Sequence, residues 1–315
     1  MSRVVKPPLT KPDLKRFRLY ADGAVQFVDC RVQHPLSFAY VADLHLPPIH
    51  SDRWPARYRQ AIEWWNVDSR DPHSAFEHLL DEICARSVDF VFFGGDILDY
   101  YDAETAAHVA EMCRRRGITA YFQIGNHDWE DAYTRYVSHA YTAAIRQENA
   151  GKLAEQWGMP DRFYSFDVAG IRFVALDTLY AADAEGWSGA IDDRQADWFC
   201  ERTTHNGPIV VFHHVPFNRP TLEYRLRAIW RGMLACIKED AIGQRVRIAL
   251  ESNANILGTF VAHAHLRSED PLGQTCQFMT SAGCYRQWRY VRIANREPPK
   301  SLVAAGEPMV ESEDT

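Results

Sequence analysis

Short apolar runs alternate with amphipathic stretches along most of this chain of 315 residues. An apolar run of about four to eight residues predicts a buried strand, and apolar residues spaced about three or four apart predict a helix. Strands are predicted at residues 24–32, 36–42, 90–93, 118–124, 162–168, 171–176, 208–212, 256–261, 276–280 and 288–293. Helices are predicted at residues 74–86, 103–116, 130–158 and 192–200. Strands that alternate with helices in this way indicate an α/β fold.

The two ends of the chain depart from this pattern. Residues 1–16 are rich in proline and lysine, residues 298–315 are acidic, and neither stretch has apolar periodicity. Segments of such composition bury too little apolar surface to fold on their own. We therefore predict a flexible arm at residues 1–16, one folded domain at residues 17–297, and an acidic tail at residues 298–315.

The composition limits the partners that the protein can have. The chain is 46% hydrophobic and 24% charged, without an apolar run that could cross a bilayer or a signal core at its start. These features predict a cytoplasmic protein that does not contact a membrane. The net charge of -7 weighs against a protein that binds nucleic acid by neutralising phosphates. Nothing in the composition predicts an oligomeric state.

Side chains that can bind metal ions follow several of the predicted strands. The apolar run at residues 90–93 ends in Gly94-Gly95-Asp96, which places a carboxylate at the carboxyl end of a buried strand. Ligands of α/β sheets bind at this edge, where a carboxylate can bridge two metal ions. Asp43 and His45 follow the strand at residues 36–42, and a side-chain period of two directs both to the same side.

Three further strand ends carry the same kinds of side chain. Gly125-Asn126-His127-Asp128 follows the strand at residues 118–124 and offers an amide oxygen and an imidazole. The pair His213-His214 follows the strand at residues 208–212, and His263 and His265 alternate with alanine after residues 256–261. One buried histidine is usually a core residue, but polar ligands at five strand ends predict a shared metal site.

Taken in order, these strand ends resemble the five motifs of the calcineurin-like metallophosphoesterases. The motifs are Asp43-x-His45, Gly95-Asp96-x-x-Asp99, Gly125-Asn126-His127-Asp128, His213-His214 before Pro216, and His263-x-His265. The resemblance implies a four-layer α/β/β/α sandwich of two mixed sheets flanked by helices. It also implies two metal ions at the strand ends, as in other two-metal hydrolases.

The resemblance further implies which residues hold each metal ion. The first ion is held by Asp43, His45, Asp96 and His265, and the second by Asp96, which bridges, with Asn126, His213 and His263. In the fourth motif the family's ligand is usually the histidine nearer the strand, which favours His213 and leaves His214 as the alternative. Because imidazole prefers later transition metals, this set suits Mn, Fe or Zn better than Mg or Ca.

A mechanism follows from the same resemblance. Two cations lower the pKa of a shared water, and the resulting hydroxide attacks phosphorus in line. His127 stabilises charge on the phosphoryl oxygens and protonates the leaving oxygen. Asp99 orients His127, and the alternative role for Asp99 is a helix N-cap.

The expected substrate is a small phosphate ester. Residues 163–178 resemble the prokaryotic branch that hydrolyses cyclic nucleotides and glycerophosphodiesters, which favours a phosphodiesterase. The alternatives are a phosphomonoesterase of the same fold and a scaffold that binds a partner without catalysis. Substrate-contacting loops are expected at residues 54–65 and 219–231, which are rich in tryptophan and arginine. For residues 54–65, a surface helix that buries its aromatic side is the alternative interpretation.

Overall fold

The computed structural model describes residues 17–50, 55–65, 71–130, 143–180, 188–219, 222 and 235–296. The predicted arm at residues 1–16 and the predicted tail at residues 298–315 lie outside the described residues. So do the first part of the predicted helix at residues 130–158 and most of the arginine-rich stretch at residues 219–231.

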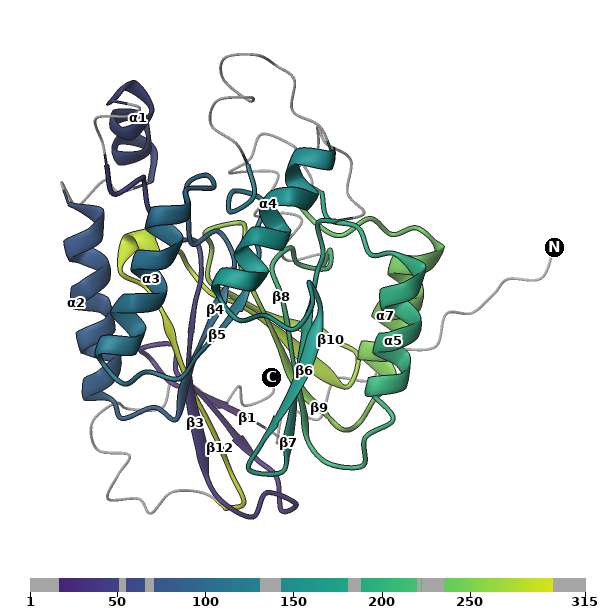
Figure 1. Ribbon diagram of the computed structural model, residues 1–315. Coiled ribbons are helices and arrows are strands. Elements are labelled where there is room, and N and C mark those ends of the chain that lie inside the picture. Colours follow the sequence, from purple (N-terminus) through teal and green to yellow (C-terminus); the bar gives the residue numbers. More distant parts are fainter. Residues whose placement is uncertain are drawn as a thin grey trace.

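Two six-stranded sheets form the centre of the molecule (Figure 1). The first has the strand order β1-β2-β12-β3-β4-β5 and the second the order β10-β11-β9-β8-β7-β6. The strands of the first are β1 (Phe17–Leu19), β2 (Val25–Val28), β3 (Leu36–Val41), β4 (Phe90–Gly94), β5 (Ala120–Gln123) and β12 (Arg289–Ala294). Those of the second are β6 (Tyr164–Val168), β7 (Ile171–Leu176), β8 (Ile209–His213), β9 (Ile256–Val261), β10 (Ser268–Leu272) and β11 (Thr275–Met279). Both sheets contain parallel and antiparallel pairs, so both are mixed.

Helices cover the outer faces of both sheets. The helices α2 (Pro72–Ala85) and α3 (Ala103–Arg115) lie beside the first sheet, and α5 (Asp193–Arg202) and α7 (Ala241–Ser252) lie beside the second (Figure 1). The predicted four-layer sandwich is therefore confirmed. Three further elements are α1 (Pro55–Trp65), α4 (Ala143–Gln156) and the short 3₁₀ helix η3 (Gly283–Tyr285). None of the helices in the described ranges is long and apolar enough to span a bilayer.

Aromatic rings from both sheets pack between the layers. The rings of Phe92 on β4 and Phe212 on β8 are stacked, with centroids 3.7 Å apart and planes 11° apart. Phe38 on β3 meets Phe212 and Phe260 edge to face, at centroid distances of 5.6 and 5.5 Å. Each such pair contributes about 0.5–1.5 kcal/mol beyond the burial of its area. This packing fixes the ends of β3, β4, β8 and β9 relative to one another, and the candidate site lies at those ends.

Aspartates begin four of the helices. The N-caps of α2, α3, α5 and α7 are Asp71, Asp102, Asp192 and Asp240, and each side chain accepts hydrogen bonds from backbone N–H groups of the first turn. Satisfying these N–H groups stabilises the helix end by about 1 kcal/mol. Because Asp102 caps α3, the alternative role of Asp99 as that helix's N-cap is wrong.

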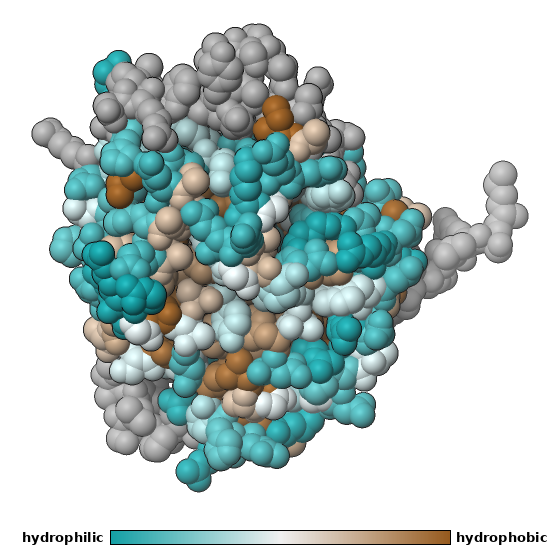
Figure 2. Space-filling model, in the orientation of Figure 1, coloured by the Kyte–Doolittle hydropathy of each residue, from teal (hydrophilic) through white to brown (hydrophobic). Residues whose placement is uncertain are grey.

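The face of the molecule seen in Figure 2 is mainly polar. Figure 2 shows one face, on which hydrophilic residues predominate and hydrophobic ones are scattered. Among the described residues, the exposed large hydrophobic side chains include Trp64, at 48%, and Tyr285, at 37%. Both lie near the candidate site: Trp64 neighbours Trp65 at a ring distance of 6.1 Å, and Tyr285 neighbours His265 at 5.9 Å.

Candidate metal centre

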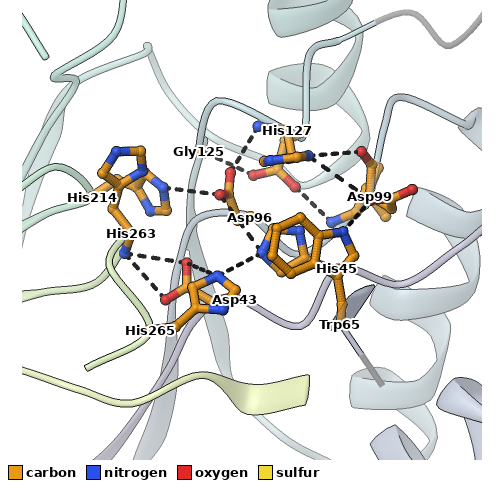
Figure 3. Close-up of polar contacts among 12 residues, drawn as sticks. Asp43, His45, Trp65, Asp96, Asp99, Gly125, His127, His214, His263 and His265 are labelled. Atoms are coloured by element: carbon orange, nitrogen blue, oxygen red, sulfur yellow. Dashed lines mark hydrogen bonds and ion pairs between the residues drawn. The ribbon is translucent and has the colours of Figure 1, made fainter. Parts of the chain in front are cut away.

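Loops at the carboxyl ends of strands from both sheets meet at one place (Figure 3). The loop after β3 is tied to the loop after β4 by hydrogen bonds from Asp43 N–H to the Gly95 carbonyl and from His45 N–H to the Asp96 carbonyl, both 3.0 Å long. The loops of the two sheets are joined where His263 N–H donates to the Asp43 carboxylate, at 3.1 Å from Oδ2. Backbone contacts therefore bring side chains from distant parts of the sequence together.

The first group of metal-binding atoms comes from Asp43, His45 and His265. Their ligand atoms all lie within 4.8 Å of one another. The Nε2 atoms of His45 and His265 are 2.9 Å apart, and His265 Nε2 is 4.0 Å from Asp43 Oδ1. Two imidazole nitrogens and a carboxylate that converge on one point form an arrangement typical of a transition-metal site.

The second group comes from Asp96, His214 and His263, again with all ligand atoms within 4.8 Å. His214 Nδ1–H donates to the Gly94 carbonyl at 2.8 Å, which directs Nε2 to within 3.2 Å of Asp96 Oδ2. A hydrogen bond of this kind at the far nitrogen is how proteins orient metal-binding histidines. Asp96 Oδ2 is also 3.9 Å from His45 Nε2, and Asp96, His45 and His127 form a further group of ligand atoms within 4.8 Å, so Asp96 reaches both sides of the centre.

Asn126 lies beside Asp96. Its Oδ1 atom is buried and has no hydrogen-bond partner among the described residues. The next residue, His127, donates its backbone N–H to Asp96 Oδ1 at 2.8 Å, and a Cβ on Gly125 would collide with the same carboxylate. Only glycine allows this close approach. A buried amide oxygen without a partner, in a residue whose two neighbours contact Asp96, fits a bound cation.

The structure separates the two histidines of the fourth motif. His213 is the last residue of β8, and its Nδ1–H donates to the Val215 carbonyl at 2.7 Å while its ring contacts Phe217. Among the described residues, His214 joins the grouped ligand atoms and His213 does not. Adjacent side chains at a strand end point to opposite sides, so only one of the pair can face Asp96. The geometry favours His214 in place of the predicted His213.

The backbone around these residues is strained. In the described part of the chain, five of the eight non-glycine residues with positive φ are Asp43, His45, Asp96, His263 and His265, at +46° to +72°. The left-handed region costs a non-glycine residue roughly 1–2 kcal/mol. Strain of this kind persists where the surroundings enforce it, and it gathers at functional sites.

Residues 36–266 match the family profile described as calcineurin-like phosphoesterase. The chain belongs to this family. Members typically bind two metal ions and hydrolyse phosphate esters, so the chain is assigned as a metallophosphoesterase. The residues that converge here lie within the matched range.

Several solved structures are similar to this metallophosphoesterase at low sequence identity. A dimetal phosphatase from Danio rerio is 14% identical with a TM-score of 0.46, over 78% of this chain and 87% of that one. A purple acid phosphatase from yellow lupin is 9% identical with a TM-score of 0.46, over 81% and 46%. A NAD nucleotidase from Haemophilus influenzae is 14% identical with a TM-score of 0.41, over 79% and 45%. The chain thus spans less than half of the last two proteins. None of the curated proteins matches this chain.

Burial controls the ionisation of the metallophosphoesterase centre. It raises the pKa of Asp43 to about 8, and it lowers the pKa of His265 to about 3. Burial also holds the pKa of His45 well below its usual value. Both histidines are therefore neutral at neutral pH and keep a nitrogen lone pair, which is the form that binds metal ions.

The pKa of His214 reflects the buried carboxylates around it. Burial lowers the pKa of His214, but the Asp96 and Asp43 carboxylates and the Gly94 carbonyl together outweigh burial and raise that pKa to about 9. Burial likewise acts to raise the pKa of Asp96, and the attraction of His214 and His127 holds it well below its usual value. Buried carboxylates need such compensation, which either a proton on His214 or a bound cation provides.

His127 and Asp99 are buried and lie together beside His45 and Asp96 (Figure 3). His127 Nδ1–H donates to the backbone carbonyl of Asp99 at 3.1 Å, while the nearest oxygen of the Asp99 carboxylate is 3.9 Å away. The short contact between the two residues is therefore with the main chain of Asp99. The neighbouring Trp65 donates its indole N–H to Asp99 Oδ1 at 2.9 Å.

Two contributions were not predicted from the sequence as separate roles. Asp128 accepts hydrogen bonds of 2.7 Å from the backbone N–H groups of Leu98 and Gly125, and so joins the loops after β4 and β5. Asp128 stands in the third motif, and that position is the sequence feature that could have indicated this role. Trp65 lies in the aromatic stretch expected to contact substrate, and its ring contacts His45 and His265.

Proposed function

We propose that this metallophosphoesterase hydrolyses small phosphodiesters, of the nucleotide or glycerophosphodiester type, with a pair of Mn, Fe or Zn ions. The observation that carries the proposal is that Asp96 belongs to the second ligand group and also lies 3.9 Å from His45 of the first. Shared carboxylates of this kind are typical of two-metal hydrolases. The mixed oxygen and nitrogen donors suit later transition metals.

The ligand sets follow from the two groups. Asp43, His45, Asp96 and His265 would hold one ion, and Asp96, Asn126, His214 and His263 would hold the other. Bound metal ions supply an activated water and neutralise charge on the phosphoryl group.

The charges around the centre favour a diester over a monoester. Within the described part of the chain, the ion-pair partners of Asp43 and Asp96 are histidines, without an arginine or lysine. A phosphomonoester carries nearly two negative charges at neutral pH, because its second pKa is about 6. A diester carries one and needs less cationic compensation. A phosphomonoesterase of the same fold is the second candidate.

His127 would act on the leaving group. Its Nδ1–H is directed to the Asp99 carbonyl, so the ring orientation is fixed by a backbone group. The ring meets that of His45 edge on, at a centroid distance of 4.6 Å, which places it beside the first ligand group. A histidine in this position can donate a proton from Nε2 to the leaving oxygen.

Hydrolysis of matched esters tests the proposal. The purified protein is stripped of metal, reloaded with Mn²⁺ or Zn²⁺, and offered an aryl phosphodiester or the corresponding aryl phosphomonoester. We expect kcat/KM to be higher for the diester. A strong preference for the monoester would make the second candidate correct, and no turnover of either ester with any metal would favour a scaffold that binds a partner.

A further inference from the structure

One tryptophan contacts the first ligand group and the candidate proton donor. Trp65, the last residue of α1, stacks on the ring of His45 with a centroid distance of 4.3 Å and an angle of 14° between planes (Figure 3). The same indole meets His265 at 5.2 Å and, edge on, His127 at 5.6 Å. It therefore touches two candidate metal ligands and the candidate proton donor.

The indole also makes a polar contact. Trp65 Nε1–H donates to Asp99 Oδ1 at 2.9 Å, and the Asp99 side chain is 0% exposed. The oxygen that accepts this bond is the carboxylate oxygen 3.9 Å from His127 Nδ1. A carboxylate removed from water keeps a fixed orientation only where donors hold it. Trp65 is such a donor to Asp99. The backbone carbonyl of Asp99 in turn accepts the hydrogen bond from His127 Nδ1–H.

The adjacent tryptophan provides a contrast. Trp64 is on the same helix, its side chain is 48% exposed, and its ring lies 6.1 Å from that of Trp65. Trp65 combines ring stacking with a directed hydrogen bond, which is how a supporting residue locks the geometry of a reactive one.

We propose that Trp65 is a positioning residue: its indole N–H fixes Asp99, and thereby the orientation of His127, while its ring holds His45 by stacking. This inference rests on the proposed function, because His127 donates a proton only in that reaction. In the reaction, hydroxide oxygen bonds to phosphorus and the bond from phosphorus to the leaving oxygen breaks. The leaving oxygen takes the proton from His127 Nε2. An alkoxide needs that proton, whereas a nitrophenolate leaves as the anion.

The test is Trp65→Phe, which keeps an aromatic ring on His45 and removes the N–H donor. The substrates are two phosphodiesters that share the retained group and differ in the leaving group, one a nitrophenolate and one an alkoxide. We expect kcat to fall about tenfold for the alkoxide ester and less than about twofold for the nitrophenolate ester. Trp64→Phe is the matched control and should change neither value.

Two measurements do not depend on turnover. The protein has nine tryptophans, each with an indole N–H signal in the NMR spectrum. In the metal-free protein, the signal that is lost in Trp65→Phe is assigned to Trp65. Asp99→Asn should move that signal upfield, because the amide is a weaker acceptor than the carboxylate. Competition with a chelating dye should show similar Mn²⁺ affinity in the Trp65→Phe variant and the parent protein, and weaker affinity in Trp65→Ala, which also loses the stacking.

The outcomes separate this inference from the function it rests on. Equal losses for both leaving groups would make Trp65 a packing residue, and unchanged kcat for both would remove it from the reaction; either result overturns the inference. An indole signal unmoved by Asp99→Asn would also overturn it. If the parent protein hydrolyses no phosphate ester with any metal, the proposed function itself fails, and the indole signal still reports whether the contact exists.

Discussion

The adjacent histidines of the fourth motif offer a matched test of the metal assignment. His213 and His214 are both 0% exposed, and each donates Nδ1–H to a backbone carbonyl, at 2.7 and 2.8 Å. Only His214 places Nε2 beside Asp96, at 3.2 Å. Replacing either by alanine removes a buried imidazole and one hydrogen bond, but only His214→Ala should remove a metal ligand.

The geometry sets the expected size of the two effects. Each alanine variant should lose about 2–4 kcal/mol of stability, from a cavity and a lost hydrogen bond. Loss of a residue that only supports a metal ligand weakens metal binding roughly 10–100-fold, and loss of a ligand should cost more. We therefore expect His214→Ala to weaken binding of one metal ion by more than about 100-fold, or about 2.8 kcal/mol. His213→Ala should bind both ions nearly as the parent protein does.

Calorimetric titration of each metal-free variant with Mn²⁺ measures the affinities and the number of ions bound. Thermal unfolding in the same buffer shows whether each variant is folded, and glutamine replaces alanine where it is not. The expected stoichiometry is two ions for His213→Ala and one tightly bound ion for His214→Ala. The opposite result, with one ion lost in His213→Ala and none in His214→Ala, would refute the assignment of His214.

Three further predictions follow from the site. Asn126→Ala should lower kcat more than about 100-fold, because it removes an orphaned oxygen ligand; near-parental turnover would show that Asn126 is not a ligand. Gly125→Ala should displace Asp96 and abolish metal binding measured by calorimetry, whereas Gly151→Ala, where an added Cβ meets nothing within 4 Å, should bind metal normally. The pKa of His214 is raised to about 9. Its proton therefore stabilises the metal-free protein in full at pH values below the pKa of histidine in the unfolded chain, about 6.5. That contribution is lost as the pH rises through 9. The melting temperature of the metal-free protein should therefore fall between pH 6.5 and 9, and a fall of equal size in His214→Ala would contradict this source.

The strands and their chemistry could be predicted because the signal is local. Apolar runs such as residues 90–93 and 256–261 correspond to β4 and β9, and the polar residues directly after them reach the site. The strands predicted at residues 162–168 and 171–176 form an antiparallel pair joined by a turn at Ala169-Gly170, with φ of +53° and +78°. A buried strand that ends in glycine and a carboxylate carries its position and its function in the same few residues.

Elements with a weak local pattern were missed. The helix α7 has only Gly243, Val246 and Leu250 as buried residues, and its Ile248 is 57% exposed, so the apolar stripe is narrow. The strand β10 reads Ser-Glu-Asp-Pro-Leu and forms because β11 pairs with it in antiparallel register. Neighbouring strands, rather than intrinsic preference, decide such segments.

The details of the site depend on contacts that the sequence does not encode locally. The choice between His213 and His214 depends on where β8 ends, and a shift of one residue reverses which side chain faces Asp96. The contact of Trp65 with Asp99 joins residues 34 positions apart from different elements. Such contacts follow from how the layers pack, and no spacing rule predicts them.

The central claim is that side chains from both sheets hold a pair of cations that share Asp96. Crystals grown with Mn²⁺ and measured at a wavelength with strong manganese anomalous scattering test it directly. The account predicts two anomalous peaks about 3.5–4 Å apart, with the Asp96 carboxylate between them and His265 and His214 on opposite sides. A single peak, or peaks away from Asp96, would contradict it.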